Sequence, residues 1–432
     1  MQYSRHTLKN GLRVITVPME NSLSVTVMIL LGVGSRYERA EVNGITHFLE
    51  HMLFKGTKKR PSAFLLSDVI DSIGGEWNAA TGKESTVYYI KAGAKNINMV
   101  FDILCDMVAN SLLDTREIER EKGVIVQEIS MYEDTPARRV TEIFETLLYP
   151  NSSLGWDIAG TPEIVRKITK ADFEELYNDF YYPENMVVVI TGGVNSRQSL
   201  KLTQRYLGHL VPRNASKLKN SKKESNESVN EKFVQTEPQV LLKTKKTDQA
   251  HLTLGFRGHA RGLADRWTEE VLAAILGGGM SSRLFVAVRE RRGLAYYVRS
   301  DVEHYQDNGY LAVYAGVAPR KIVQAIKVTL SEIGKLKRTK ISNKELNKGK
   351  EFVKGHLALS LEDTRNVAGF LGAFEILEGS AVSPEEVVKN IDRVTSADIQ
   401  RVAREFFVPE KLNLAVIGPY KSGEKFKKML RL

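Results

Sequence analysis

Cysteine, long hydrophobic runs and a leader-like N-terminus are scarce or missing in this 432-residue chain. Its single cysteine, Cys105, cannot form an internal disulfide, which excludes a disulfide-stapled scaffold and favours a reducing compartment. The longest apolar stretches, such as 25–33 and 186–190, are much shorter than the roughly 18 residues that a membrane-spanning helix needs. The first residues contain no basic head followed by an apolar segment, so the sequence predicts no signal peptide. We therefore expect a soluble, cytoplasmic protein with no membrane partner.

Excess positive charge is present, but it is confined to two segments. The net charge is +10; residues 213–246 hold nine Lys or Arg against four Glu, and residues 421–431 hold five against one. These segments account for nine of the ten excess charges and leave the rest of the chain nearly neutral. A nucleic-acid site requires a basic patch on a folded surface, which this distribution does not supply. We expect no nucleic-acid partner.

The chain is long enough for more than one domain, and it contains an internal repeat. Residues 214–232 have almost no apolar side chains and many Ser, Asn and Lys, which is typical of a linker. On either side of it, the segment 169–192 aligns with 395–418 at a constant offset of 226, with identical Thr, Ala, Asp, Phe, Pro, Glu and Gly. The sequence therefore predicts two homologous domains, residues 1–213 and 233–432, joined by the linker 214–232.

Both halves contain strand-like and helix-like patterns. Alternating β-branched runs predict strands over 12–17, 24–30, 85–92, 187–190 and 310–317. Periodic apolar positions predict helices over 62–73, 99–109, 115–132, 171–180, 267–276 and 321–336. Because hairpins as well as helices join the strands, we expect the α+β class, with a largely antiparallel sheet packed with helices in each domain.

The sharpest motif is His47-Phe-Leu-Glu50-His51, in a segment whose apolar residues and Thr46, a weak cap, favour a helix. With eight His and 52 acidic residues, chance yields only about 0.02 such motifs in a chain of this length. The two histidines are four apart and Glu50 is three after the first, so all three lie on one helical face. Two imidazoles can bind one metal, and a carboxylate beside them can take a proton from a metal-activated water. Two histidines that cap or pack a helix are the alternative.

A catalytic zinc site needs a third protein ligand in addition to two imidazoles. The charged helix predicted over 115–132 offers Glu121 and Glu128, which are seven residues apart and therefore lie two turns apart on one face. One of them could bind the metal while the other supports an imidazole from outside the coordination shell. Acidic residues on so charged a helix are usually solvated, and composition does not rank the two.

The motif and its surroundings resemble the pitrilysin or insulinase family of zinc peptidases, most closely its mitochondrial processing peptidase-like subgroup. His-x-x-Glu-His is the inverted zincin motif, and a further glutamate, Glu128, follows its last histidine by 77 positions. The resemblance extends over essentially the whole chain, including Gly34-Ser-Arg-Tyr-Glu38 before the motif and Phe54-Lys-Gly-Thr57 after it.

This resemblance assigns roles to the residues of the motif. It implies one Zn²⁺ per chain, bound by His47, His51 and Glu128. It also implies that Glu50 is the general base and that Glu121 supports the site.

The resemblance further implies substrate contacts in both halves. Arg289 and Tyr296, seven residues apart after a glycine run, match residues of the family that reach the bound peptide. A guanidinium and a phenol can donate hydrogen bonds to peptide carbonyls and to the oxyanion of a tetrahedral intermediate. Asn78, Ala79 and Ala80 match an edge strand that pairs with the substrate main chain. Without the resemblance, Arg289 would be an ordinary charged helix residue and the segment around Ala79 a plain hairpin.

The second half lacks the metal motif. At the offset of 226, Ala273, Leu276 and Gly277 stand opposite the first histidine, the glutamate and the second histidine. One domain is therefore predicted to be catalytic and the other supportive. Together they are expected to form a clamshell around a central cavity, with zinc on one wall and Arg289 and Tyr296 on the other.

The sequence thus predicts a zinc-dependent endopeptidase that cleaves peptides or unfolded segments. The family also implies a homodimer. The alternative is a non-catalytic peptide-binding or scaffold subunit of the same family, which would usually have lost one or more of the four motif residues. All four are present here. Relatives in the subgroup process basic presequences or degrade short peptides, and the sequence does not separate these two substrate classes.

Overall fold

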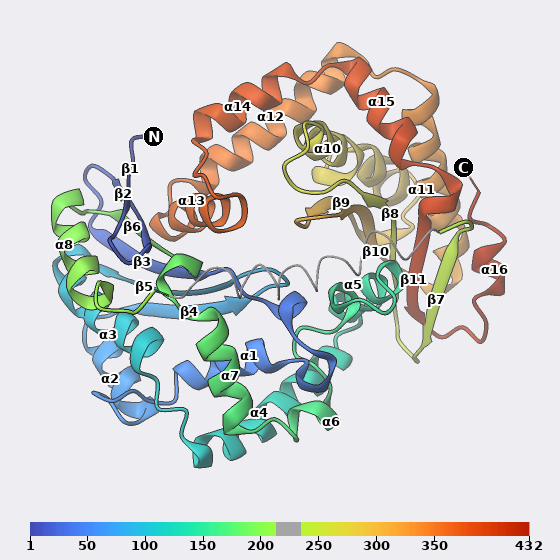
Figure 1. Ribbon diagram of the computed structural model, residues 1–432. Coiled ribbons are helices and arrows are strands. Elements are labelled where there is room, and N and C mark those ends of the chain that lie inside the picture. The colour runs from blue at the N-terminus through green and yellow to red at the C-terminus, as the bar shows by residue number, and fades with distance from the viewer. Residues whose placement is uncertain (213–234, 432) are drawn as a thin grey trace. The chain divides into compact units, whose positions relative to one another are not determined.

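The computed structural model describes residues 1–212 and 235–431 (Figure 1). The linker predicted over 214–232 lies outside these residues. Unit 1 comprises residues 1–130, 156–212 and 359–385 of the described chain, and unit 2 comprises residues 131–155, 235–358 and 386–431. These units are not the contiguous halves expected from the sequence, because 131–155 and 359–385 each lie in the unit formed mostly by the other half.

Unit 1 contains a mixed, six-stranded sheet. Its strands, in spatial order, are β1 (Ser4–Thr7), β2 (Arg13–Pro18), β6 (Met186–Gly192), β3 (Ser24–Leu31), β5 (Thr86–Gly93) and β4 (Glu76–Thr81). All neighbours pair antiparallel except β2 and β6, which are parallel. The expected α+β class with a largely antiparallel sheet is therefore confirmed.

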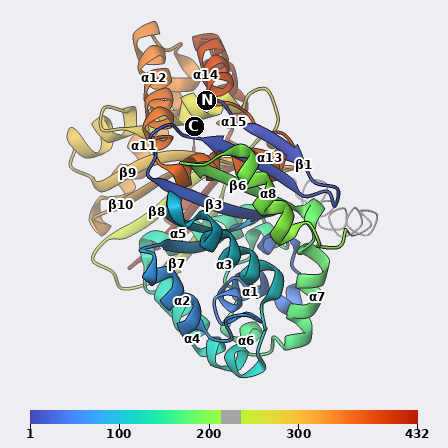
Figure 2. The ribbon, with the colours of Figure 1, turned by 90° about the vertical axis from the view of Figure 1, so that its left-hand side faces the viewer.

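Helices cover both faces of this sheet, which explains why its central strands are apolar almost without interruption. Alternate residues of β3, from Val25 to Leu31, pack against one set of helices. These are α1 (Ile45–Leu53), α2 (Ala63–Ser72), α3 (Ile97–Asn110), α7 (Lys170–Phe180) and α8 (Ser196–Leu207). On the opposite face, Met28 and Leu30 pack against α13 (Thr364–Glu378). Figure 1 shows α13 on one side of the sheet and α1, α3 and α7 on the other; in Figure 2, α3 and α8 lie side by side.

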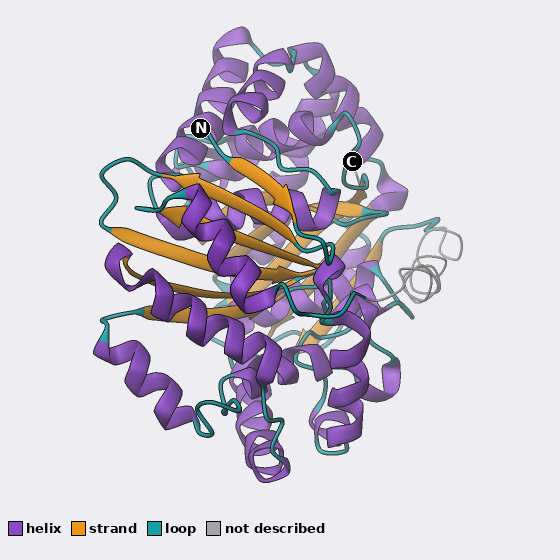
Figure 3. Ribbon diagram, turned by 60° about the vertical axis from the view of Figure 1, so that its left-hand side comes forward, coloured by secondary structure: helices purple, strands orange, loops and turns teal. Residues whose placement is uncertain are grey.

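Unit 2 contains a five-stranded sheet with the same character. Its strands, in spatial order, are β7 (Gln239–Thr244), β11 (Leu412–Gly418), β8 (Ala250–Gly258), β10 (Gly309–Val317) and β9 (Ala295–His304). Only β7 and β11 are parallel. Helix α5 (Pro136–Leu148) packs on one face, and the helices α10 (Arg266–Ala273), α11 (Ile322–Arg338), α15 (Ser396–Phe406) and α16 (Glu424–Lys427) complete the unit. Figure 3 shows the strands in orange with the helices in purple.

Within the described residues, the chain passes from one unit to the other in three helices and one loop. The helices are α4 (Thr115–Glu133), α12 (Asn343–Ser360) and α14 (Pro384–Arg393), and the loop contains Gly155 and Trp156 before the short helix α6 (Pro162–Val165). None of the helices of the described residues is long and apolar enough to cross a membrane.

Residues 131–155 and 359–385, the two crossing segments, each contain a helix, and these helices correspond in the internal repeat. Shifting α5 by the repeat offset of 226 places it on residues 362–374, which overlap α13. Helix α5 buries Ile143 and Phe144 against the sheet of unit 2, and α13 buries Ala368 and Leu371 against the sheet of unit 1. Each half of the sequence therefore supplies one helix that completes the core of the unit formed mainly by the other half.

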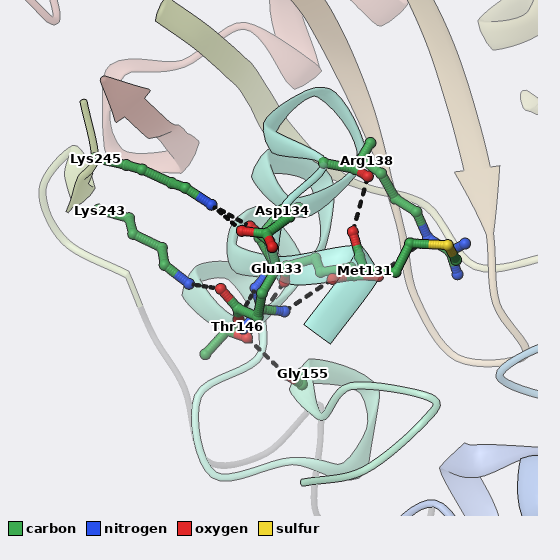
Figure 4. Close-up of polar contacts among 11 residues, drawn as sticks. Met131, Glu133, Asp134, Arg138, Thr146, Gly155, Lys243 and Lys245 are labelled. Atoms are coloured by element: carbon green, nitrogen blue, oxygen red, sulfur yellow. Dashed lines mark hydrogen bonds and ion pairs between the residues drawn. The ribbon is translucent and has the colours of Figure 1, made fainter. Parts of the chain in front are cut away.

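Polar contacts fix the first crossing segment within unit 2 (Figure 4). Lys245 Nζ lies 2.8 Å from Asp134 Oδ1, and Lys243 pairs with the carboxylate of Glu133. At the far end of α5, the Thr146 hydroxyl donates to the carbonyl of Gly155 at 2.8 Å. The lysine contacts tie the start of the segment to β7 and the residue that follows it, and the Thr146 contact lies within the segment.

The internal repeat has a local structural basis. Thr169 begins α7 and Thr395 begins α15, and each forms a capping box with the aspartate three residues later. In both copies a short 3-10 turn with Pro then leads into a fully buried strand, β6 or β11. The residues shared at the offset of 226 are therefore those that start the helix and direct the chain into the sheet.

Candidate metal centre

The predicted motif lies on α1, whose N-terminal N–H groups are capped by a side chain from the preceding loop. Gly44, in the left-handed region at φ 97°, precedes the helix and provides no side-chain cap. Instead, the buried carboxylate of Glu38 accepts hydrogen bonds from the backbone N–H groups of Gly44 and Thr46, both at 2.8 Å. The prediction that Thr46 caps the helix was wrong, because Thr46 already lies inside it and the acceptor comes from the preceding loop.

The loop that carries Glu38 is itself fixed by a buried ion pair. Arg36 is fully buried and its Nη1 lies 2.6 Å from Glu84 Oε1. A Cβ on Gly34 would meet the carbonyl of Gly82 at 2.4 Å, so only glycine permits this close approach. The motif Gly34-Ser-Arg-Tyr-Glu38 therefore holds the start of α1 in place.

The two motif histidines lie on one face of α1, as their spacing predicts. Their ring centroids are 4.7 Å apart. Glu128, on α4, faces both rings: its Oε1 lies 3.7 Å from His47 Nε2 and its Oε2 lies 3.4 Å from His51 Nε2. The structure thus brings together the three ligands that the family resemblance implies.

The spacing of these three side chains fits a zinc ion. One ligand atom from each lies within 4.8 Å of the others. Tetrahedral zinc holds donors at about 2.0–2.2 Å from the metal, which places them about 3.3 Å from one another. The two separations, 3.7 Å from His47 Nε2 to Glu128 Oε1 and 3.4 Å from His51 Nε2 to Glu128 Oε2, are of similar size and involve different oxygens of the carboxylate. The donor set of two imidazoles and a carboxylate is also the one used by catalytic zinc sites that keep a fourth position open.

Glu121 lies behind the ligands and contacts His51. Its Oε1 is 2.9 Å from His51 Nδ1, while its Oε2 is 2.6 Å from Lys55 Nζ. Glu121 is only 2% exposed, so these two partners replace water around the carboxylate. A hydrogen bond at Nδ1 leaves Nε2 of His51 free to bind metal, which is the support predicted for Glu121.

Lys55 was missed by the sequence analysis. It follows His51 by four residues, just past the end of α1, and this spacing on a helical face was the available signal. Its ammonium pairs with the buried carboxylate of Glu121 on the side away from His51 Nδ1, through the second oxygen.

The carboxylates control the protonation of His51. Burial disfavours its charged form, but hydrogen bonds with Glu121 and Glu128 overcome this effect and raise the pKa of His51 to about 9. Burial would also raise the pKa of Glu121, yet His51 and Lys55 hold it below its usual range. Metal binding at Nε2 must therefore displace a proton from His51 at neutral pH.

Glu50 points toward the end of strand β4. The hydroxyl of Thr81 donates a hydrogen bond to Glu50 Oε2. Burial raises the pKa of Glu50 above its ordinary value, although the Thr81 hydrogen bond and the charge of His51 act in the opposite direction. A raised pKa suits a group that accepts a proton and later returns it. Thr81 is the second residue that sequence reasoning missed, although it directly follows the segment 78–80 singled out there.

The predicted substrate strand is an edge strand. Strand β4 pairs with β5 and ends the sheet of unit 1 on that side. Asn78 and Ala80 are exposed and Ala79 is half-buried. The two alanine side chains are small and allow another backbone to approach this edge. The open edge leaves backbone groups available for an added strand.

Arg289 and Tyr296 lie in unit 2. Arg289 is on a π-helical turn, η7 (Phe285–Glu290), and Tyr296 is near the start of β9. The Arg289 guanidinium lies 5.8 Å from the Tyr296 ring centroid, and Tyr296 is 72% exposed. The two residues are therefore neighbours, and the Tyr296 side chain is accessible to a ligand. Their contact with a peptide stays a prediction.

The residues of unit 2 that align with the metal motif at the repeat offset of 226 are apolar and buried. Ala273 ends α10, and Leu276 and Gly277 lie in the π-helical turn η6 (Ala274–Gly278) that follows it. The helix predicted over 267–276 thus changes form at its glycine run. Within the part of the chain that the structure describes, His47, His51 and Glu128 of unit 1 are the only set of three possible metal ligands that lie close together.

Family models match both halves of the chain. Residues 13–162 match the model described as Insulinase (Peptidase family M16), and residues 167–353 match the Peptidase M16 inactive domain. The first match includes the candidate ligands His47, His51 and Glu128, and the second includes residues 273–277, which align with the motif but lack its residues.

Relatives and solved structures extend the similarity to nearly the full length. An uncharacterized zinc protease of Bacillus subtilis is 37% identical over 96% of this chain and 98% of its own. One of Streptomyces coelicolor is 36% identical, over 96% of this chain and 90% of its own. A protease from Helicobacter pylori, 24% identical, superposes with a TM-score of 0.87 over 97% of this chain and 99% of that chain, which supports the fold. A peptidase M16 inactive domain from Pseudomonas fluorescens, 17% identical, gives 0.85 over 98% and 99%. The family matches, together with relatives named zinc proteases, show that this chain belongs to the insulinase family of peptidases, family M16.

Proposed function

We propose that this protein is a zinc endopeptidase whose site is built on α1 and α4. The observation that carries the proposal is the convergence of His47, His51 and Glu128 at zinc-like spacing. Glu50, one turn after the first histidine, supplies a carboxylate with a raised pKa beside them. A scaffold subunit of the family would have no use for this complete set.

Zinc bound by these residues would lower the pKa of a water molecule to about 7 and polarise the scissile carbonyl. Glu50 then acts at both stages of the reaction. It accepts the proton of the water as the water oxygen forms a bond to the carbonyl carbon, and it returns this proton to the nitrogen as the carbon–nitrogen bond breaks. Glu121 holds the ring of His51 throughout, because its Oε1 accepts a hydrogen bond from Nδ1.

We propose that the peptide binds as an added strand along β4. The open edge at Asn78, Ala79 and Ala80 supports this mode, and it would recognise main chain rather than a particular side chain. Arg289 and Tyr296 are proposed to donate hydrogen bonds to the peptide carbonyls or to the oxyanion. The substrates would then be extended peptides or unfolded segments.

The test compares wild type with Glu50→Gln on a quenched fluorescent peptide library, with metal analysis of both proteins. Glu50→Gln should keep one zinc per chain and lose activity by roughly 10²-fold or more, because an amide cannot accept the proton. Glu119→Gln is a matched control, since Glu119 is an exposed acid on α4 paired only with Lys122 in an i,i+3 contact. Peptidase activity of Glu50→Gln within tenfold of wild type would refute the assignment, and a wild type that binds zinc but cleaves nothing would favour the scaffold alternative.

A further inference from the structure

We infer that Thr81 is a positioning residue for the general base, acting through the orientation of the Glu50 carboxylate. This inference rests on the proposed function, because it assigns a role within the same site. Thr81 is the last residue of β4, and its hydroxyl donates to Glu50 Oε2. This donor, fixed at the end of a strand, restrains the position of the carboxyl group.

The position of Thr81 is set by packing between β4 and α1. Along β4 the half-buried residues alternate with exposed ones, and Trp77 and Thr81 belong to the half-buried set. The Trp77 ring packs against Phe54, just past the end of α1, with centroids 4.8 Å apart. Beyond Thr81, the chain turns tightly, with Gly82 N–H donating to the Ser85 carbonyl at 2.9 Å. Ring packing at one end and the turn at the other therefore hold the hydroxyl opposite Glu50.

Orientation is the effect that this contact controls. A glutamate side chain has several rotatable bonds, and fixing them in advance removes a cost from the reaction step. With Oε2 engaged by Thr81, Oε1 is left to accept the proton of the water. The same hydrogen bond makes the carboxylate a slightly weaker base, so its loss would have two opposing consequences. Misplacement of a reacting group by about 1 Å can cost roughly 10²-fold, so we expect the loss of orientation to dominate.

Thr81 also joins the general base to the strand proposed to bind the peptide. It directly follows Asn78, Ala79 and Ala80 on β4. A peptide paired along this edge would restrain the strand at the residue that holds Glu50. Substrate binding and orientation of the base are thereby linked through one short segment.

The experiment compares Thr81→Val, which removes the hydroxyl at nearly constant volume, with Thr81→Ser, which keeps it. Thr86→Val is the matched control. Thr86 is the cross-strand partner of Thr81, and its buried hydroxyl donates to the Val33 carbonyl, away from Glu50. For each protein, zinc content, the midpoint of thermal unfolding, kcat and KM are measured on one quenched fluorescent peptide that wild type cleaves. A second set of proteins combines Thr81→Val with Glu50→Gln.

Thr81→Val should lower kcat about tenfold or more and change KM less than about threefold, with zinc content unchanged. Thr81→Ser should stay within about threefold of wild type. Thr86→Val should lower the unfolding midpoint and leave kcat unchanged. In the Glu50→Gln background, Thr81→Val should have no further effect, because two residues that act as one unit are not additive. If Thr81→Val does not fold, Thr81→Cys, of similar size but a weak donor, takes its place.

The outcomes separate this inference from the proposed function. If wild type cleaves, Glu50→Gln does not, and Thr81→Val matches wild type, only the role of Thr81 is refuted. An equal loss of kcat in Thr86→Val would also refute it, because the effect would then come from the hairpin as a whole. If Glu50→Gln cleaves as well as wild type, the proposed function is refuted and the inference falls with it.

Discussion

Units 1 and 2 each contain histidine and glutamate side chains in contact, but the two clusters are built differently. In unit 1, His47 and His51 project from one helix toward Glu128 on another. In unit 2, one carboxylate bridges two imidazoles: Glu269 Oε1 lies 2.6 Å from His259 Nδ1, and Oε2 lies 2.7 Å from His304 Nε2.

The difference decides what each cluster can bind. In both units the two oxygens of one glutamate face two imidazoles, but the contacts of the 1% exposed Glu269 are hydrogen bonds of 2.6 and 2.7 Å, whereas those of Glu128 are 3.7 and 3.4 Å. In unit 1 a second acid, Glu121, satisfies Nδ1 of His51 and leaves Nε2 directed toward Glu128. The two clusters therefore share residue types but differ in the helical spacing of their histidines and in the presence of a separate supporting carboxylate.

The largest changes in the free energy of unfolding are expected at α5 and α13, the helices that each half of the sequence contributes to the unit formed mainly by the other half. Leu371→Ala on α13 should lower the free energy of unfolding by about 2–5 kcal/mol, and Phe144→Ala on α5 by about 3–5 kcal/mol, because both side chains are fully buried. In calorimetry, added zinc should stabilise the transition that Leu371→Ala shifts, since the three proposed zinc ligands all belong to unit 1. Leu359→Ala, at a 69% exposed position, is the control. Zinc stabilisation of the transition shifted by Phe144→Ala would contradict the division.

Glu128→Gln should weaken zinc binding by about 10²-fold or more, because a neutral amide is a poorer ligand than a carboxylate. Glu121→Gln should weaken it by about 10- to 100-fold, as is usual for a residue that supports a ligand. Zinc affinity is measured by competition with a chelator. Glu269→Gln in unit 2 is the control and should leave it unchanged. A larger loss for Glu121→Gln than for Glu128→Gln would show that the two roles are reversed.

Tyr296→Phe tests whether unit 2 takes part in catalysis. The change removes one hydroxyl from an exposed side chain, so folding and zinc content should not change. If the hydroxyl donates to the substrate, kcat/KM should fall by an amount equivalent to about 1–3 kcal/mol. Tyr3→Phe, which removes a hydroxyl bonded to the Ala381 carbonyl in unit 1, is the matched control. Wild-type kinetics for Tyr296→Phe would remove Tyr296 from the site.

The bridged cluster of unit 2 should give a small pH dependence of stability. The hydrogen bond to Glu269 raises the pKa of His259 above 6.5, so this stabilisation is complete below about pH 6.5 and is lost as pH rises through the folded pKa. Burial would raise the pKa of Glu269, but the two histidines lower it below 4.5, so its stabilisation is lost as pH falls through that folded pKa. The cluster therefore stabilises unit 2 most between about pH 4.5 and 6.5.

His259→Gln should flatten this dependence by about 1 kcal/mol or less, because His259 is partly exposed. The measurement is chemical unfolding of both proteins between pH 5 and 8; the contribution of His51 is common to both and cancels in their difference. Identical pH profiles for His259→Gln and wild type would show that the contact with Glu269 contributes nothing.

Local features of the fold were predictable from the sequence, and distant contacts were not. The predicted helices over 62–73 and 115–132 match α2 and α4 within about one residue at each end, because Ser62 caps the first and apolar spacing defines both. The spacing of His47 and His51 gave their shared face. Glu128 and Glu121 could be ranked only through the family resemblance, because their separation fixes a common face but not which one meets a ring.

The remaining features depend on residues far apart in the chain. An apolar helix face, such as that of α13, indicates that a helix is buried but not which sheet covers it. The cap on α1 comes from Glu38, outside the helix, and Thr81 meets Glu50 across 31 positions. No local pattern specifies such contacts.

The exchange of α5 and α13 also sets the order in which the protein can be completed during synthesis. The helix α13, which covers the Met28 face of the first sheet, is not finished until residue 378, although the last strand of that sheet ends at Gly192 and α8 ends at Leu207. At 5–20 residues per second, a ribosome needs roughly 10–30 s to extend the chain from residue 212 to residue 378. During that time Ile15, Met28 and Val189 have no covering helix. Until α13 is made, the nascent unit 1 therefore exposes an apolar sheet face that a chaperone could shield.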